Sequence, residues 1–527
     1  MRRSVGASFS EISPSEFFYR NRDLAGFTNP TRALYFSLKE LVENSLDSCE
    51  ASQTPPEILV SIEVDEDGPS EDPRFYRIMV QDNGTGIPAG DLADAFGRVF
   101  YGSKFKLRQS RGIFGMGATM TLLYAQATTG KPAFVASSTT GRRYHGLLMK
   151  VDIERNRPVI LRRLEGRARG WRGTLVSATI LGDYQKAESK VISYLEQTAM
   201  AAPYASITFR DPRGRQMVLE KVVDSVPRPP RETLPHPSGV DVETLRKMVK
   251  AWRGGGLADF MVRNFQRVGP KTAEAFLAYA KLDPRTDPRT LTEADLSRLA
   301  SALRSYGGFL PPDASYLSTL GPELLEAGVR RLLQPEFCAV ESRPPQAYEG
   351  HPFVVEAAVA YGGPRLKPGL TVFRFANRIP LLYDESSDVT WKVLNSMDLR
   401  SYRVGPEDPV GVVVHLVSTK IPYKTIGKEY IADRPEVERE IRLALRSLFR
   451  ALRNYLSRKE HMVGVARRAN IYSKYMPLIA RFSAELAGRA RLPRYEALIP
   501  RAERAGEGDG EDGGAGEGPR IHNTENN

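Results

Sequence analysis

Cysteine is scarce in this chain of 527 residues, which contains only Cys49 and Cys338. Two cysteines cannot build a disulfide framework or a thiolate metal cluster, and they indicate a reducing, intracellular compartment. Histidine is scarce as well: the six histidines are scattered and show no metal-ligand spacing such as His-Glu-x-x-His. The sequence therefore argues against a disulfide-stabilised protein and against a zinc centre of that type.

Long apolar runs are missing too. No run reaches the roughly 18 apolar residues that a membrane-spanning helix needs. The basic start, residues 1–6, is not followed by an apolar run and so is not a secretory signal. We therefore expect a cytoplasmic protein that does not enter a membrane.

Positive charge, in contrast, is in excess, with a net charge of +12 at pH 7. This excess favours a polyanionic partner, most simply nucleic acid, although a generally basic proteome would produce the same charge. The chain is too long for one core, and we expect about three domains. A Gly/Glu-rich stretch at residues 506–514 cannot bury a core and predicts a disordered tail.

Residues 31–50 predict a helix, because their leucines form an apolar stripe at helical spacing. Glu40, Asn44 and Asp47 fall at i, i+4 and i+7 and share a second face. A carboxylate can take a proton from water, and an amide oxygen suits a magnesium ion that carries phosphates. An amphipathic helix with a solvated polar face is the alternative. Glu43 is expected to be an ordinary charge of this helix.

Two alternating segments, residues 58–64 and 76–80, predict strands. The second runs into Asp82-Asn83-Gly84-Thr85-Gly86. A carboxylate just after a strand can accept a hydrogen bond from an exocyclic amine, and glycines let the backbone approach a flat ring. A plain Asn-Gly turn is the alternative interpretation.

A glycine-rich segment follows, in which Gly112, Gly115 and Gly117 precede an apolar helical run. Such a turn at a helix start presents backbone N–H groups and a positive dipole end to phosphate. Ser103 and Lys104 could add a hydroxyl and a point charge. The segment is not a Walker loop, because no Gly-Lys-[Ser/Thr] follows it.

The remainder of the chain alternates in character. Further strand-like runs and a helix up to residue 210 predict an α+β domain. Residues 232–308 are helical around an Arg-Val-Gly-Pro turn, which fits either a contact with DNA phosphates or a small packing module. β-branched runs at 353–361, 370–376 and 410–417 predict strands. A lysine-bearing loop and a long helix at 435–460 come after them.

Three of these motifs together resemble the GHKL ATPases: Glu-x-x-x-Asn-x-x-Asp on a helix, Asp-x-Gly-x-Gly after a strand, and a Gly-x-x-Gly-x-Gly lid. The resemblance extends to the B subunits of DNA topoisomerase VI. It is carried by Leu-Val-Glu-Asn-Ser-Leu-Asp, Gly-Ser-Lys-Phe, the Arg-Val-Gly insert and Ser-Thr-Lys-Ile-Pro-Tyr-Lys-Thr-Ile-Gly-Lys-Glu, and it covers residues from about 9 to 475.

The resemblance implies an α+β multidomain fold. Residues 1–228 would form a GHKL (Bergerat) α/β sandwich ATPase domain with an N-terminal dimerisation strap. Residues 229–310 would form a helix-two-turns-helix domain. Residues 311–475 would form a transducer domain of the ribosomal protein S5-like α/β type with a long C-terminal helix, and residues 476–527 a C-terminal extension.

The resemblance also implies roles for the motif residues. Glu40 would be the general base that activates the attacking water, and Asn44 would hold Mg²⁺ bridged to the phosphates of ATP. Asp82 would accept the adenine amino group, with Gly86 beside the ring. Asp47 would support the adenine side.

Other residues are expected to contact the nucleotide by the same resemblance. Ser103 and Lys104 would close over the phosphates, and Thr174 would lie near the adenine. Lys428 would reach the terminal phosphate, with Lys420 as the alternative. The lid would comprise Gly112, Ile113, Phe114, Gly115, Met116, Gly117, Ala118 and Thr119.

The activity implied is that of the ATP-hydrolysing B subunit of a type IIB topoisomerase, nucleoid-associated in the cytoplasm. ATP binding would dimerise two B subunits in an A2B2 heterotetramer. It would gate passage of one DNA duplex through a break made by the A subunit, so that supercoils are relaxed and DNA is decatenated. A non-catalytic scaffold of the same fold and a MutL-like DNA clamp are the alternatives. The intact motif residues argue against the scaffold, and the helical insert argues against the clamp.

Overall fold

The computed structural model describes residues 11–102, 107–112, 116–383, 385–423 and 430–498. The chain divides into two compact units, Met1–Phe449 and Arg450–Asn527. In the described part of the chain, no helix is long and apolar enough to cross a membrane. Short 3-10 helices are η1 (Arg22–Ala25), η2 (Pro237–Gly239), η3 (Pro288–Thr290), η4 (Glu385–Ser387), η5 (Leu399–Tyr402) and η6 (Glu496–Leu498).

An eight-stranded sheet, counted over the described residues, dominates the N-terminal half of the first unit. Its order is β5-β4-β3-β6-β2-β1-β7-β8, and its pairs are antiparallel except for β1 with β7. The strands predicted at 58–64 and 76–80 are confirmed as the neighbours β1 and β2. The strands are β1 (Glu57–Val64), β2 (Arg74–Gln81), β3 (Ala133–Ser138), β4 (Arg143–Asp152), β5 (Arg157–Arg167), β6 (Gly173–Gly182), β7 (Ser206–Arg210) and β8 (Gln216–Leu219).

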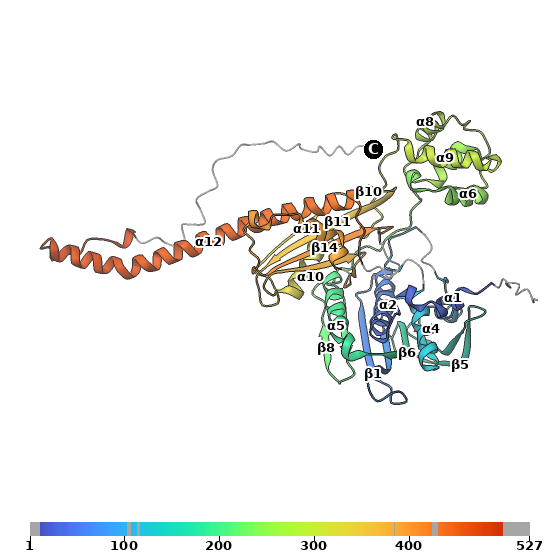
Figure 1. Ribbon diagram of the computed structural model, residues 1–527, viewed down its shortest axis with the longest axis horizontal. Helices are drawn as coiled ribbons and strands as arrows, with labels where there is room; N and C mark the ends of the chain where they lie inside the picture. Colours follow the sequence, from blue (N-terminus) through green and yellow to red (C-terminus); the bar gives the residue numbers. More distant parts are fainter. Residues whose placement is uncertain (1–10, 103–106, 113–115, 384, 424–429, 499–527) are drawn as a thin grey trace, which may run out of the picture. The chain divides into compact units, whose positions relative to one another are not determined.

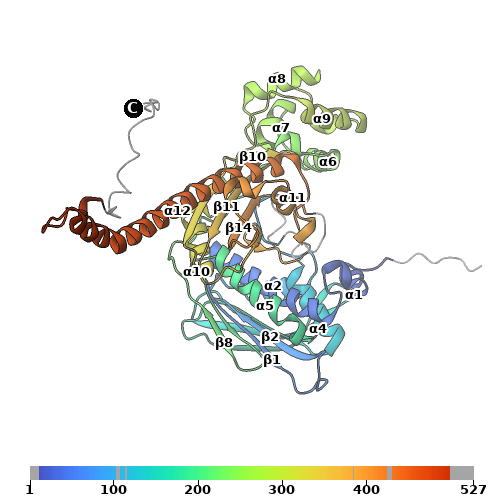
Figure 2. The ribbon, with the colours of Figure 1, turned by 60° about the vertical axis from the view of Figure 1, so that its left-hand side comes forward.

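Three helices pack on one face of this sheet (Figures 1 and 2): α2 (Pro30–Ala51), α4 (Gly117–Thr129) and α5 (Tyr184–Ala201). The Asn29 side chain caps α2 by accepting the N–H of Arg32, and proline at the first turn fixes its start. The leucine stripe of α2 is buried, as its spacing predicts. Two shorter helices, α1 (Pro14–Arg20) and α3 (Leu92–Gly97), both pack against α4.

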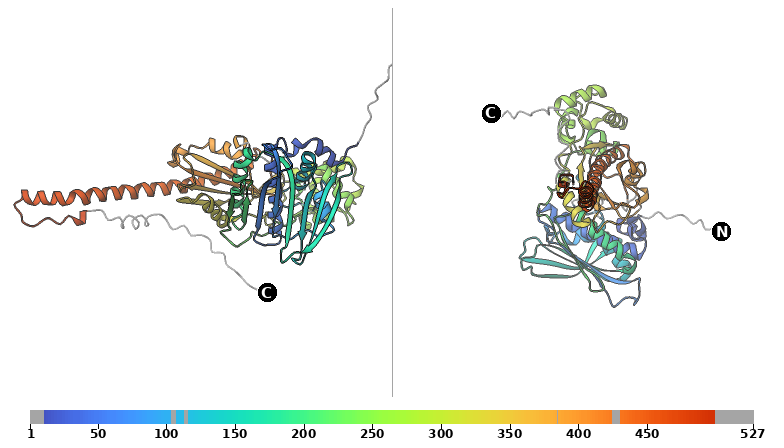
Figure 3. Two further views of the ribbon diagram at one scale, coloured as in Figure 1. Left: turned by 90° about the horizontal axis from the view of Figure 1, so that it is seen from below. Right: turned by 90° about the vertical axis from the view of Figure 1, so that its left-hand side faces the viewer.

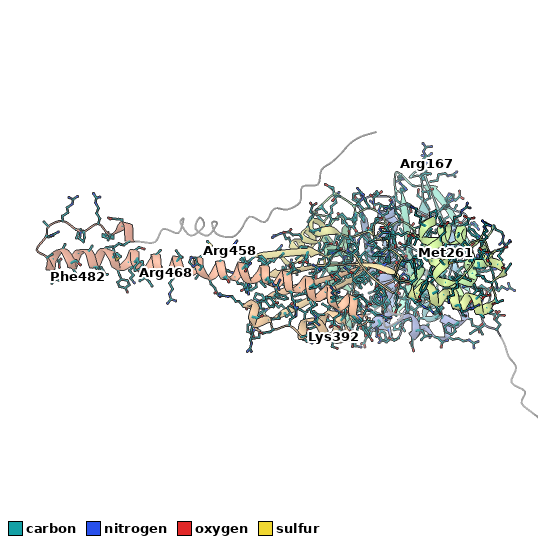
Figure 4. All side chains as sticks on the ribbon, turned by 90° about the horizontal axis from the view of Figure 1, so that it is seen from above. Arg167, Met261, Lys392, Arg458, Arg468 and Phe482 are labelled. Atoms are coloured by element: carbon teal, nitrogen blue, oxygen red, sulfur yellow. The ribbon has the colours of Figure 1, made fainter. Side chains whose placement is uncertain are left out.

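A separate helical core comes after β8 in the chain. Its helices are α6 (Val242–Ala251), α7 (Leu257–Asn264), α8 (Pro270–Ala280) and α9 (Glu293–Ser305). Buried Phe260, Met261 (labelled in Figure 4) and Phe276 belong to this core. The predicted helix–turn–helix is confirmed as α7 and α8, and the turn between them places Arg267 at φ +55°.

A second sheet occupies the C-terminal part of the first unit. Among the described residues it has six strands, with order β10-β11-β14-β12-β13 and β9 on β11; β12 and β14 are parallel. The strands predicted at 353–361, 370–376 and 410–417 are confirmed. The elements are α10 (Gly321–Leu333), β9 (Phe337–Ser342), β10 (Gln346–Tyr348), β11 (His351–Tyr361), β12 (Leu370–Ala376), β13 (Ile379–Pro380), α11 (Val389–Asn395) and β14 (Val410–Ser418).

The long helix α12 (Pro435–Leu486) extends well beyond the predicted residue 460 and can be followed in Figure 3. Its first turns, within the first unit, bury Val437, Ile441 and Leu445. From Arg450 the helix belongs to the second unit. There it exposes cations together with large apolar side chains, among them Arg458, Arg468 and Phe482 in Figure 4.

Candidate nucleotide site

Glu40 lies against the start of α4. A side-chain carbon placed on Gly117, the first residue of that helix, would lie 1.8 Å from Glu40 Oε2. The helix start carries free backbone N–H groups and the positive end of the helix dipole, which favour a carboxylate or a phosphate. Met116 at the N-cap has no side-chain oxygen with which to cap these groups. The base candidate and the phosphate-binding candidate therefore meet at one point.

Lys39 provides a second contact for Glu40. Its Nζ lies 3.4 Å from Glu40 Oε1 and 3.0 Å from Glu43 Oε1. Burial alone would lower the pKa of Lys39, but Glu43 and Glu40 together raise it well above its ordinary value. Lys39 is therefore a fixed cation beside the candidate base.

The expectation that Glu43 is an ordinary charge is wrong. Its side chain is only 3% exposed and forms a buried ion pair with Lys39. Tyr194 of α5 donates its hydroxyl to the backbone carbonyl of Lys39 at 3.3 Å and so joins α5 to this part of α2. A buried ion pair keeps both members charged only because each neutralises the other. Glu43 is therefore a buried partner of Lys39 in the core of the domain and not a surface charge.

Asn44 and Asp47 continue the same helical face and are half-buried. Asp47 Oδ1 accepts a hydrogen bond from Arg111 Nη1 at 2.8 Å. The sequence interpretation missed Arg111, although its place directly before Gly112 marks it as part of the glycine-rich segment. This contact ties the polar face of α2 to the start of that segment.

Asp82 follows the end of β2 and is only 4% exposed. Its Oδ1 accepts the backbone N–H of Gly84 at 2.9 Å and that of Thr174 at 3.2 Å. Burial raises its pKa to about 6, even though these two N–H groups act to lower it. The predicted residues Asp82 and Thr174 are therefore brought together, 92 positions apart in sequence.

Gly86 adjoins this group in a left-handed conformation, with φ +68°. A side-chain carbon there would lie 2.3 Å from the Ser138 carbonyl oxygen, so only glycine fits. Ser137 Oγ accepts the N–H of Ile87 and donates to the Gly173 carbonyl, both at 2.8 Å. Ser137 thus joins the turn to β6 and was not singled out by its sequence.

Several predicted residues lie outside the described residues: Ser103, Lys104, Ile113, Phe114, Gly115 and Lys428. Of the described lid residues, Ala118 and Thr119 are buried, and Thr119 donates its hydroxyl to the Arg98 carbonyl at 3.3 Å. Their side chains therefore support α4, while the backbone at its start faces Glu40.

The lysine-bearing loop, residues 418–429, begins close to Glu40, the candidate base. Burial raises the pKa of the Tyr423 hydroxyl, and the charges of Lys39, Glu43 and Glu40 also act on it. A β-bridge between Tyr423 and Ile431 joins the two sides of the segment that contains Lys428. Lys420 is exposed. Burial lowers the pKa of His351 to about 4, and the charge of Lys420 adds to that effect.

Within the described residues, no group of three or more His, Cys, Asp or Glu side chains could hold a metal ion. A site without such a cluster still suits Mg²⁺ that is bound together with a nucleotide. That ion keeps several waters and takes only one or two protein oxygens besides the phosphates. Asn44, on the same helical face as Glu40 and one turn further along, offers such an oxygen.

Comparisons with known proteins agree with this geometry. Residues 30–149 match the family described as Histidine kinase-, DNA gyrase B-, and HSP90-like ATPase. Residues 312–468 match the Topoisomerase VI B subunit, transducer family. The chain is thus a GHKL ATPase with an ATP-binding domain, joined to a transducer.

Whole-length relatives identify the family within this class. The type 2 DNA topoisomerase 6 B subunit of Metallosphaera sedula is 42% identical over 485 residues, which cover 91% of this chain and 90% of the relative. Its counterpart in Sulfurisphaera tokodaii is 40% identical over 481 residues, covering 90% and 89%. The counterpart in Saccharolobus shibatae is 40% identical over 484 residues, covering 91% and 90%. The chain belongs to the family of type 2 DNA topoisomerase 6 B subunits.

Proposed function

We propose that this chain binds ATP with Mg²⁺ and hydrolyses it as the B subunit of a type IIB topoisomerase. ATP binding dimerises two B subunits, and the A2B2 assembly passes one DNA duplex through a break made by the A subunit. Residues 1–228 act as the ATPase domain, 229–310 as the helix-two-turns-helix domain and 311–475 as the transducer. The observation that carries the proposal is the contact between Glu40 and the first residue of α4.

Glu40 is the general base of the proposed reaction. Phosphate bound at the start of α4 would lie next to the Glu40 carboxylate, since Glu40 lies against Gly117, the first residue of that helix. A water between them could give its proton to Glu40 and attack the terminal phosphorus, while the bond from that phosphorus to the bridging oxygen breaks and ADP leaves. Lys39 keeps the carboxylate in place through the opposite oxygen, Oε1. Glu40 thus has the position that a base for hydrolysis requires.

Asn44 would hold the Mg²⁺ ion through its side-chain oxygen. When bound, the ion would neutralise phosphate charge and orient the terminal phosphate for attack. Because one protein oxygen suffices for Mg²⁺ shared with phosphates, the modest donor set of α2 fits this ion better than a protein-only cage.

Asp82 is the proposed adenine acceptor. Two backbone N–H groups fix its Oδ1, so the orientation of the carboxylate is set before the nucleotide arrives. Its raised pKa of about 6 still leaves it ionised at neutral pH, as an acceptor must be. Gly86 allows the ring to approach the backbone, and Thr174 completes the site. Asp47 supports this side through its contact with Arg111.

Lys428 is the proposed lysine of the transducer that contacts the terminal phosphate. A flexible ammonium group suits a role as a point charge. The charges of Lys39 and Glu43 act on Tyr423, which borders the segment that contains Lys428, whereas Lys420 is exposed and acts on His351; this supports Lys428 over Lys420. Ser103 and Lys104 are proposed to act on the phosphates as well.

Strand passage tests the whole proposal. The purified chain is combined with a type IIB A subunit, supercoiled and catenated DNA, ATP and Mg²⁺. ATP-dependent relaxation and decatenation are expected, and DNA cleavage without the A subunit is not. ATP hydrolysis without strand passage by any A subunit tried would favour the clamp, and binding of ATP without turnover would favour the scaffold.

A further inference from the structure

A buried carboxylate at the end of α2 receives hydrogen bonds from two distant arginines. Glu50 is 5% exposed and accepts Arg111 Nη2 at 2.6 Å on Oε1 and Arg111 Nη1 at 2.9 Å on Oε2. Arg378 Nη1 contacts Oε2 at 2.8 Å, and the Tyr204 hydroxyl contacts Oε1 at 2.5 Å. Burial alone would raise the pKa of Glu50, yet Arg111 and Arg378 hold it below its ordinary value.

Arg111 connects this carboxylate to the nucleotide site. Its Nη1 also contacts Asp47, one turn before Glu50 on α2. Arg111 and Arg378 thus place positive charge against the carboxylates of Asp47 and Glu50. Arg111 immediately precedes Gly112, so the position of Arg111 fixes the position at which the glycine-rich segment begins.

Arg378 belongs to the tight turn between β12 and β13 in the second sheet, with φ +68°. Its backbone N–H donates to His415 Nε2 at 3.0 Å. The other ring nitrogen of His415 contacts Glu356 Oε2 at 2.8 Å, and Glu356 accepts two backbone N–H groups at the start of α10. The backbone of Arg378 is thus fixed to the core of the transducer region through His415 and Glu356.

The neighbouring Asn377 makes a parallel connection. Its side-chain amide donates to the Ser110 carbonyl at 3.2 Å and to the Ser418 carbonyl at 2.9 Å. Ser110 lies directly before Arg111, and Ser418 ends β14. Asn377 therefore holds this segment directly, and Arg378 is connected to it through Glu50.

We propose that Glu50 is a positioning residue that makes nucleotide binding depend on the transducer turn. Withdrawing either arginine from a buried carboxylate leaves its charge under-compensated, which is costly. A shift of the β12–β13 turn that moves Arg378 must therefore also shift Glu50 and Arg111, and with them the start of the glycine-rich segment. This inference rests on the proposed function, because it assumes that the nucleotide occupies this site.

A double-mutant cycle tests the coupling. The affinity of the full chain for a non-hydrolysable ATP analogue with Mg²⁺ is measured by calorimetry for the parent, Arg111→Met, Arg378→Met and the double variant. Each single change is expected to weaken binding by about tenfold, and the double variant by little more, because both disrupt one cluster. Effects that multiply to about 100-fold would overturn the inference.

Arg374→Met is the matched control. Arg374 lies on the adjoining strand β12 and is as buried as Arg378, at 1% against 4% exposed, but its contacts are with Asp388 and the Leu381 and Tyr383 carbonyls. Its loss should lower the thermal midpoint similarly and leave nucleotide affinity unchanged. Affinity that falls with the midpoint in both variants would mean a purely structural role and overturn the inference.

Arg378→Lys serves if Arg378→Met does not fold. It keeps the charge but loses the guanidinium geometry that also reaches the Ser318 carbonyl at 2.9 Å. Arg378→Lys is expected to weaken nucleotide binding less than Arg378→Met does, and to cause little further loss of affinity when it is combined with Arg111→Met. A further loss of the same size in the Arg111→Met background would contradict the coupling. If the parent chain itself fails to bind the analogue, the proposed function fails instead.

Discussion

Replacing Gly117 by alanine should separate catalysis from folding at this site. The added carbon would lie 1.8 Å from Glu40 Oε2, whereas ordinary contact begins at 3.4 Å. The carboxylate must therefore withdraw by about 1.6 Å, and because the added carbon would also lie 2.4 Å from Cδ and 2.7 Å from Cγ, the whole Glu40 side chain must change its rotamer. A displacement of that size in a catalytic group costs on the order of 100-fold in rate.

The fold should tolerate the same change. Alanine is favoured over glycine in a helix by roughly 0.5–1 kcal/mol, so the thermal midpoint should stay level or rise. Turnover is measured at saturating ATP, and unfolding is followed by circular dichroism. Gly464→Ala is the control, because this glycine also lies in a helix and an added carbon there meets nothing within 4 Å. Parental turnover in Gly117→Ala would refute the placement of Glu40 against α4.

Three further outcomes are expected. Nucleotide affinity should fall as pH drops through about 6, where Asp82 becomes protonated, and Asp82→Asn should bind weakly with no such pH dependence; a retained pH dependence in titrations would exclude Asp82 as its source. Lys428→Ala should reduce turnover at least tenfold while Lys420→Ala does not, and the reverse result in a steady-state assay would reassign the lysine. DNA affinity should fall steeply with salt, and a flat salt titration would argue against phosphate contacts.

Local patterns were sufficient to predict much of this fold. The leucine stripe of α2, the strands β1 and β2, and the helix pair α7 and α8 each follow from residues close together in sequence. Asp82 could be singled out because a carboxylate directly follows a predicted strand and precedes two glycines, although a plain Asn-Gly turn accounts for the same pattern. The extent of α12 was underestimated: beyond residue 460 its large apolar side chains, among them Ile471, Leu478 and Phe482, are exposed and do not join a buried core.

Long-range contacts account for what the sequence did not reveal. Glu43 looks like a surface charge on a helical wheel, yet it is buried in the fold and paired with Lys39. Glu50 and Arg378 are 328 positions apart, so no local pattern could pair them. Arg111 carried a usable signal, its place beside Gly112, but its partners depend on how α2 ends.

Hydrolysis of ATP by Glu40→Gln tests the central claim most directly. Glutamine preserves the size of the side chain and can still hydrogen-bond, but it cannot take a proton from water. The purified full-length variant should bind ATP with the affinity of the parent chain and lose at least about 100-fold in turnover at saturating ATP and Mg²⁺. Turnover at the parental rate would contradict the account, because Glu40 would then not be the base.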